Sequence, residues 1–168
     1  MIRARRKLLT VLAGLATLLI AAYLKRVAPP EPRPSTAPRL SDTRHCVRVV
    51  DGDTIVLDGG EKVRLIGVDT PETVDPRRPV QRFGKEASAF TRRTVEGKPV
   101  RLEYDEDTRD RYGRTLAYVY LSDGTLLNAE IIRQGYGFAY TRFPFRYQAQ
   151  FVRLEREARE GGRGLWAR

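Results

Sequence analysis

Short stretches rich in hydrophobic and β-branched residues, typical of β-strands, recur along the chain from Cys46 onward. The stretches 46–50 and 54–58 are rich in β-branched residues and flank Asp-Gly-Asp, a sequence typical of a tight turn, so we expect a hairpin there. Three further stretches have the same character, at 62–68, 99–105 and 114–121. The pattern therefore predicts five short strands.

Hydrophobic residues at helical spacing predict three helices among these strands. Residues 84–95 place Ala87 and Phe90 on one face, residues 126–137 form a short apolar segment closed by glycine, and residues 146–162 are amphipathic. Five strands interrupted by helices predict an α+β fold that is mainly β. We expect a five-stranded OB-fold barrel with about three packed helices.

An uncharged apolar run at residues 8–24 precedes the strands and is flanked by basic residues on both sides. Its length lies at the short end of what spans a bilayer, where ~20 residues are usual. We expect residues 1–27 to form an apolar helix that is a membrane anchor or a signal peptide. The heavier positive charge on its N-terminal side predicts a domain outside the cytoplasm, or a secreted one if the segment is cleaved.

A Pro-rich stretch follows the apolar run and predicts a semi-rigid linker at 28–43, because proline disfavours helix and sheet. The domain that contains the predicted strands and helices then occupies residues 44–168. Most of the formal net charge of +10 lies in the first forty residues, so the domain itself is nearly balanced. The basic composition is therefore weak support for a nucleic-acid partner.

The composition also excludes several kinds of chemistry. Cys46 is the only cysteine and His45 the only histidine, which rules out an intramolecular disulfide, a cysteine-rich zinc site and mechanisms built on several histidines. No Gly-rich phosphate-binding or nucleotide-binding motif is present. Any catalytic chemistry must therefore come from carboxylates, arginines, tyrosines and a hard metal ion.

Acidic residues gather at two points that a small barrel can bring to one rim. Asp51 and Asp53 lie in the predicted hairpin turn, and Asp69 and Glu72 follow the third strand. Each pair could simply be a solvated turn or loop. Together, however, carboxylates held close to one another are unfavourable unless a cation lies between them. An oxygen-only site of this kind favours Ca²⁺ or Mg²⁺.

Arginines accompany both acidic groups. Arg64 begins the segment that ends in Asp69, and Arg114 closes an Arg-Tyr-Gly-Arg sequence. These could be an outward-facing strand residue and a hairpin tip. Beside a metal site, however, planar guanidinium groups suit the binding of a phosphate. A metal, two arginines and one spare carboxylate are the groups that a phosphodiester hydrolase needs.

Four motifs carry a resemblance to the thermonuclease (staphylococcal nuclease-like) family, and they run in the family's order. They are DGDT (51–54), RLIGVDTPE (64–72), FGKEASAFT (83–91) and DRYGRTLAYVY (110–120). The match extends from about Cys46 to Trp166. The resemblance implies an OB-fold domain, monomeric, that cleaves DNA and RNA with Ca²⁺ and leaves 3′-phosphate ends.

The resemblance also implies a role for individual residues. Asp53 and Asp69 would ligate Ca²⁺ together with the backbone carbonyl of Thr70, and Asp51 would support them. Glu72 would orient or deprotonate the attacking water. The arginines at 64 and 114 would bind the scissile phosphate, and the nucleotide would contact Arg111 and Tyr112. Residues 77–78 resemble the family's basic loop, and Tyr140 is a candidate for a second tyrosine that stacks on the substrate.

Two alternatives of other classes are weighed against a Ca²⁺-dependent nuclease. A non-catalytic nucleic-acid-binding OB-fold module would have no need of Asp53, Asp69, Glu72 and both arginines together, and all are present. In a membrane-anchored interaction or structural protein, these charges would be only solvated surface residues, with no metal binding and no catalysis. We therefore expect an enzyme, tethered to the membrane with its catalytic domain extracytoplasmic or secreted.

Overall fold

A computed structural model describes residues 40–73 and 81–167 of the chain. The predicted apolar segment 1–27, most of the linker and residues 77–78 lie outside these described residues. Within the described ranges, no helix is long and apolar enough to cross a membrane. Leu40 forms a bridge to Glu103 and Ser41 donates its backbone N–H to Leu102 at 2.7 Å, so contacts with the barrel begin before residue 44.

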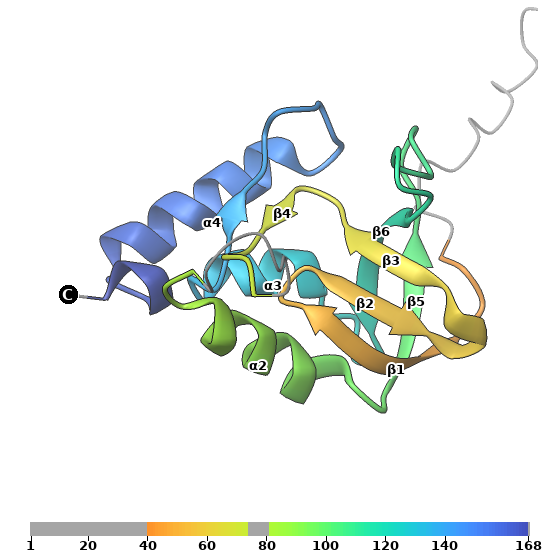
Figure 1. The fold of residues 1–168 in the computed structure, drawn as a ribbon. Coiled ribbons are helices and arrows are strands. Elements are labelled where there is room, and N and C mark those ends of the chain that lie inside the picture. Colours follow the sequence, from red (N-terminus) through yellow and green to blue (C-terminus); the bar gives the residue numbers. More distant parts are fainter. Residues whose placement is uncertain (1–39, 74–80, 168) are drawn as a thin grey trace, which may run out of the picture. The chain divides into compact units, whose positions relative to one another are not determined.

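Five strands close into a barrel, which confirms the predicted α+β architecture and fits an OB-fold (Figure 1). The order around the barrel is β1-β2-β3-β6-β5, with β5 returning to β1. All neighbours are antiparallel except β3 and β6. The strands are β1 (Arg44–Asp51), β2 (Thr54–Leu57), β3 (Lys62–Leu65), β5 (Pro99–Glu103) and β6 (Thr115–Leu121).

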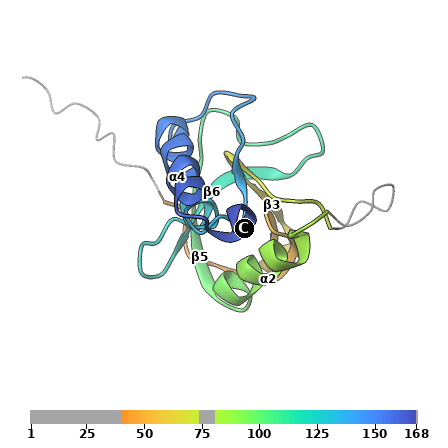
Figure 2. The same cartoon turned by 90° about the vertical axis from the view of Figure 1, so that its left-hand side faces the viewer.

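Three helices pack against the barrel, as predicted: α2 (Gly84–Val95), α3 (Leu127–Arg133) and α4 (Gln148–Glu160). Helix α2 contacts β1, α3 contacts β6, and α4 packs on α3. Figures 1 and 2 show α2 and α4 on different sides of the folded domain. Helix α2 has the predicted bounds, whereas α3 and α4 are shorter at both ends than predicted. Short 3₁₀ segments lie at η1 (Asp58–Gly60) and η2 (Gly164–Trp166).

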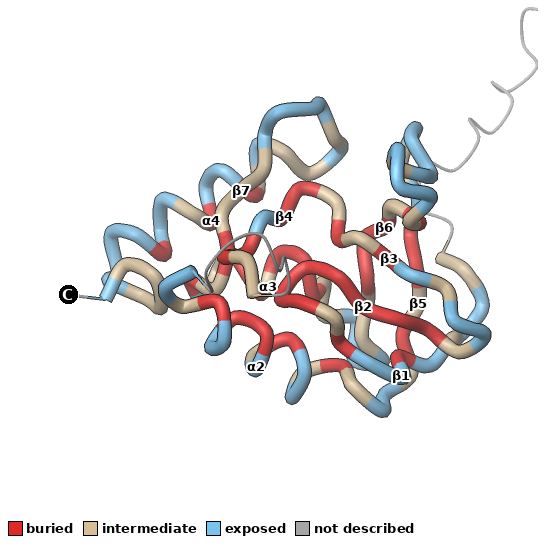
Figure 3. The backbone as a smooth tube through the Cα atoms, viewed as in Figure 1, coloured by how far each residue is buried: buried red, intermediate tan, exposed pale blue. Residues whose placement is uncertain are grey.

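Buried residues of the strands fill the barrel interior, and every residue of β2 is buried (Figure 3). On β3, Val63 and Leu65 are buried in the core, whereas Lys62 and Arg64 face away from it. Burying an aliphatic side chain of this size stabilises the fold by about 1.5–3 kcal/mol. This alternation fixes the register, and it places the Arg64 guanidinium on the outer side of the barrel rim.

The prediction of one continuous strand over 62–68 was wrong. Strand β3 ends at Leu65, and the chain turns before β4 (Val68–Asp69), which leaves the barrel and pairs with β7 (Phe138–Ala139). Gly67 makes the turn with φ of +72°, and a Cβ atom there would lie 2.5 Å from the ring of Phe145. Only glycine suits this position. The turn carries Asp69 back toward the start of β2.

One buried and one partly buried acidic side chain join β5 and β6 to the residues that precede α4. Glu103, 1% exposed, accepts hydrogen bonds from the hydroxyls of Tyr120 (2.8 Å) and Tyr147 (3.0 Å). Asp105 accepts one from the Tyr118 hydroxyl at 2.6 Å and one from the backbone N–H of Arg146 at 2.9 Å. Partial burial raises the pKa of Asp105, but these hydrogen bonds lower it more, so its net pKa lies below the ordinary value.

We expect Asp105→Asn to lower the free energy of unfolding by about 1–2 kcal/mol at pH 7, because the amide weakens two hydrogen bonds to a charged acceptor. A carboxyl whose pKa is lowered by folding stabilises the protein above its unfolded pKa of about 3.9, and this contribution disappears as the pH falls through the folded-state pKa. Urea unfolding at pH 7 and pH 3 measures the difference, with the exposed Asp107→Asn as control. A gap between wild type and Asp105→Asn that is undiminished at pH 3 would contradict this assignment.

Candidate active site

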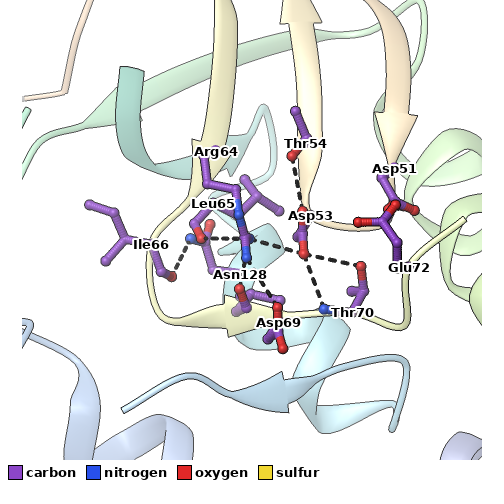
Figure 4. A network of polar contacts seen from close by, with 12 residues as sticks. Asp51, Asp53, Thr54, Arg64, Leu65, Ile66, Asp69, Thr70, Glu72 and Asn128 are labelled. Atoms are coloured by element: carbon purple, nitrogen blue, oxygen red, sulfur yellow. Dashed lines mark hydrogen bonds and ion pairs between the residues drawn. The ribbon is translucent and has the colours of Figure 1, made fainter. Parts of the chain in front are cut away.

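Most of the predicted site residues meet in one hollow at the barrel rim, of about 400 Å³, which we call the rim hollow. The hairpin turn between β1 and β2 forms one side, and the loop after β4 forms the other (Figure 4). The predicted residues that line it are Asp51, Asp53, Arg64, Asp69, Thr70, Glu72 and Arg114. The sequence expectation that two distant acidic segments share a rim therefore agrees with the geometry.

Arg64 lies between the two carboxylates predicted as metal ligands (Figure 4). Its Nη1 is 3.0 Å from Asp53 Oδ2, and its Nη2 is 3.3 Å from Asp69 Oδ1. Nη1 also donates to the backbone carbonyl of Val68 at 2.7 Å. The guanidinium is thus held beside both carboxylates. From this position it can also bind a phosphate through two parallel N–H groups.

The turn at Gly52 packs directly against the loop that follows β4. Asp53 Oδ2 accepts hydrogen bonds from the backbone N–H of Thr70 at 3.1 Å and from its hydroxyl at 3.2 Å. A Cβ atom at position 52 would lie 2.7 Å from Thr70 Oγ1, so a larger residue would push the two segments apart. This close approach to Thr70 explains why position 52 is a glycine, whatever the backbone conformation of the turn requires.

Asp51 is buried and anchors the same turn to α2 and to the loop. Its Oδ1 accepts hydrogen bonds at 2.8 Å from Ser88 Oγ, from Thr73 Oγ1 and from the N–H of Gly52. Thr91 Oγ1 donates to the Gly52 carbonyl at 2.6 Å. The sequence predicted a supporting role for Asp51 but not the hydrogen bonds from Ser88 and Thr91 on α2 to this turn, because both look like ordinary polar helix residues.

Like charges crowd the rim hollow. Partial removal from water and the neighbouring Asp53 raise the pKa of Asp69 above its ordinary value, Glu72 and Asp51 add to this, and Arg64 opposes it. Half of the Asp69 side chain remains exposed, at 51%. A hard cation would relieve this repulsion, and carboxylate and carbonyl oxygens are the ligands it prefers.

Across residues 40–73 and 81–167, no group of three or more His, Cys, Asp or Glu side chains is arranged to hold a metal. A metal ion in the rim hollow would therefore need backbone, water or substrate oxygens besides the carboxylates, and Ca²⁺ accepts such ligands. Asp53, Asp69 and the Thr70 carbonyl would supply three oxygens from the protein. Ca²⁺ takes six to eight oxygen ligands and accepts water and substrate oxygens among them.

Glu72 also lines the rim hollow, on a loop held by Gln81. The Gln81 side-chain oxygen accepts the backbone N–H of Glu72 at 3.0 Å, and the N–H of Gln81 donates to the Glu72 carbonyl at 2.9 Å. Glu72 Oε1 accepts the N–H of Thr73 at 3.0 Å. These bonds fix the backbone from which the carboxylate reaches the hollow. Sequence reasoning did not identify Gln81.

Arg114 is positioned by Asp110, which sequence reasoning also missed. Asp110 Oδ2 accepts from Arg114 Nε at 2.7 Å, and Oδ1 accepts the backbone N–H groups of Arg114 (3.0 Å) and Tyr112 (2.9 Å). Partial burial raises the pKa of Asp110, but these bonds lower it below the ordinary value. The four-residue spacing in DRYGR was the available signal.

Three of the predicted residues do not line the rim hollow. The Tyr112 ring is 68% exposed, and its hydroxyl accepts a hydrogen bond from Arg111 Nη2 at 2.6 Å. Tyr140 follows β7 and donates its backbone N–H to the Gly67 carbonyl at 3.0 Å. Neither Arg111, Tyr112 nor Tyr140 is among the residues that line the hollow.

Comparison with known proteins finds clear relatives. The family model described as "Staphylococcal nuclease homologue" matches residues 62–168. The thermonuclease of Staphylococcus hyicus is 44% identical over 129 residues, 74% of this chain and 76% of that protein. The thermonuclease of Staphylococcus intermedius is 46% identical over 125 residues, which cover 72% and 74% of the two chains. Endonuclease YncB of Bacillus subtilis is 40% identical over 127 residues, 72% of this chain and 60% of that protein.

Matches of this extent necessarily include the central part of the chain, from the first acidic turn to the Arg-Tyr-Gly-Arg sequence. The similarity therefore spans all the residues of the rim hollow and the barrel that carries them. By fold, by motif order and by identity, the chain belongs to the staphylococcal nuclease family.

Proposed function

We propose that this protein is a calcium-dependent nuclease that hydrolyses phosphodiester bonds of DNA and/or RNA with low sequence specificity and leaves 3′-phosphate ends. The observation that carries the proposal is the rim hollow, where three residues with candidate metal ligands, two arginines and Glu72 line a single space. The relatives named thermonuclease and endonuclease support the same class of activity. Low specificity follows because contacts to phosphate position a strand without reading its bases.

The candidate ion would be held by Asp53, Asp69 and the Thr70 carbonyl, and when bound it supplies positive charge to the phosphate. Arg64 and Arg114 donate to the phosphate oxygens and stabilise the charge that develops on them. Glu72 accepts a hydrogen bond from the attacking water and orients it or takes its proton. The water oxygen forms the new bond to phosphorus, the bond to the 5′ oxygen breaks, and that oxygen gains a proton from solvent.

The proposed location is outside the cytoplasm, with residues 1–27 as anchor, or in the medium after cleavage of that segment. It rests on the apolar run and its basic flanks. A nuclease with little specificity is kept away from the cell's own genome there, and Ca²⁺ is more abundant outside the cell than inside.

Product analysis tests the proposed reaction directly. The full chain is incubated with synthetic single-stranded DNA and RNA in Ca²⁺, and the product ends are identified by mass spectrometry. The proposal predicts 3′-phosphate and 5′-hydroxyl ends. Products with 5′-phosphate ends would contradict the proposed direction of cleavage.

We expect Asp69→Asn to weaken Ca²⁺ binding by about 10- to 100-fold, because loss of one charged ligand removes roughly 1.4–2.8 kcal/mol of binding free energy. A ligand that binds only the folded state raises its stability, so the rise in melting temperature with added Ca²⁺ measures affinity without reference to cleavage. Asp107→Asn, an exposed carboxylate outside the hollow, is the control. A thermal response to Ca²⁺ equal to that of wild type would place the metal elsewhere.

A further inference from the structure

A second hollow of about 530 Å³ adjoins the rim hollow, and Lys62 and Arg114 line both. The second hollow also contacts Glu61, Arg109 and Tyr112, and we call it the side groove. The phosphate-binding Arg114 therefore stands at the boundary between the two spaces. A nucleic-acid strand whose scissile phosphate lies at Arg114 could therefore continue from the rim hollow into the second hollow.

The side groove carries an excess of positive charge. Glu61 is its acidic residue, and it already accepts from the Thr115 hydroxyl at 2.5 Å and pairs with Arg44 at 3.1 Å. Lys62 and Arg109 are exposed, and neither forms an ion pair with any residue that the structure describes. Exposed cations without acidic partners attract a polyanion at low cost in desolvation.

The positions of these cations are set by the barrel. Lys62 precedes Arg64 on β3 by two residues, so both side chains emerge on the same face of the strand. Arg109 pairs as an isolated bridge with Thr115, and its Nη1 donates to the Gly113 carbonyl at 3.1 Å. Lys62 and Arg109 thus extend the row of basic groups that begins with Arg64 and Arg114.

We infer that the side groove binds the phosphodiester backbone of the substrate strand next to the scissile phosphate, with Lys62 and Arg109 as its phosphate contacts. The inference rests on the proposed nuclease function and extends it by a subsite. A single-stranded polyanion is favoured over a free nucleotide, because the groove continues from the site of cleavage and offers point charges without a set of base-reading groups.

The salt dependence of binding tests this assignment. The double variant Lys62→Gln/Arg109→Gln is compared with the unchanged groove, both in a Glu72→Gln background that keeps the strand intact. Binding of a fluorescent single-stranded DNA is followed by anisotropy at several salt concentrations. Loss of two phosphate contacts should reduce the slope of log K against log salt by about 1.4 and weaken binding about tenfold or more at 0.1 M salt.

The control double variant, Arg48→Gln/Arg156→Gln, removes two exposed cations that line neither hollow and should leave the slope unchanged. Equal slopes for the groove variant and the unchanged groove would overturn the subsite. Cleavage and binding test different proposals. A wild-type protein that binds the strand without cleaving it would refute the nuclease function. The salt dependence of binding would still show whether the side groove contacts the strand. In cleavage assays, lengthening the strand from two to twelve nucleotides should raise kcat/KM less in the groove variant than in wild type.

Discussion

Glu72→Gln is expected to reduce the rate of DNA cleavage by about 100- to 10,000-fold, the range that a positioned general base contributes. Glutamine has nearly the same shape and can still accept the N–H of Thr73 through its side-chain oxygen, which Glu72 does at 3.0 Å. It cannot take a proton from water. The change therefore removes the proposed chemistry while the loop held by Gln81 stays in place. Single-turnover cleavage in saturating Ca²⁺ measures the loss.

The matched control for this variant is Glu106→Gln, an exposed glutamate beyond the rim hollow. It should cleave at the wild-type rate. Both variants should show the wild-type rise in melting temperature on addition of Ca²⁺, because Glu72 is not among the proposed ligands. Full activity of Glu72→Gln would overturn its assigned role, and a lost thermal response would make it a metal ligand instead.

Arg114→Lys is expected to lower kcat/KM by about 100- to 1,000-fold, although it keeps the positive charge. The Nε–H of Arg114 donates to Asp110 at 2.7 Å. This bond fixes the plane of the guanidinium, and the plane sets the direction of its other N–H groups. An ammonium ion has no planar fork and cannot bond to Asp110 and clamp a phosphate in the same way. Steady-state kinetics on single-stranded DNA measures the effect.

The same exchange at Arg48, which is exposed and outside both hollows, serves as the comparison and should change kcat/KM little. Near-normal turnover by Arg114→Lys would mean that the phosphate clamp has been assigned to the wrong residue. Asp110 also accepts two backbone N–H groups, so the loss of its bond to the Arg114 side chain could destabilise this loop. The melting temperature of Arg114→Lys shows whether the variant is still as stable as the wild type.

The barrel could be predicted because its strands are short runs rich in β-branched and other apolar residues, bounded by turn sequences. The break after Leu65 could not, because it depends on contacts far along the chain. Gly67 turns under the Phe145 ring, and β4 finds its partner in β7, about seventy residues later. Alternation at 62–68 looks the same whether the last residues continue in the barrel or leave it.

The candidate site divides in the same way. Asp53, Asp69 and Glu72 could be proposed from the sequence, because they lie in two acidic segments next to predicted strands and in motifs that resemble those of the thermonuclease family. The groups that hold them could not. Ser88 lies thirty-seven residues from Asp51, and nothing in its helical setting indicates a bond to that carboxylate. Such long-range hydrogen bonds depend on the packing of α2 against β1, which only the fold provides.

Calcium-dependent cleavage of a nucleic-acid strand is tested in a single experiment. The full chain is mixed with fluorescent single-stranded DNA in Ca²⁺, in Mg²⁺ and in a chelator, and cleavage and binding are followed in the same samples. A calcium-dependent nuclease predicts cleavage in Ca²⁺ that stops in the chelator. Binding of the strand without cleavage in either metal would contradict this account and would make the protein a non-catalytic nucleic-acid-binding module.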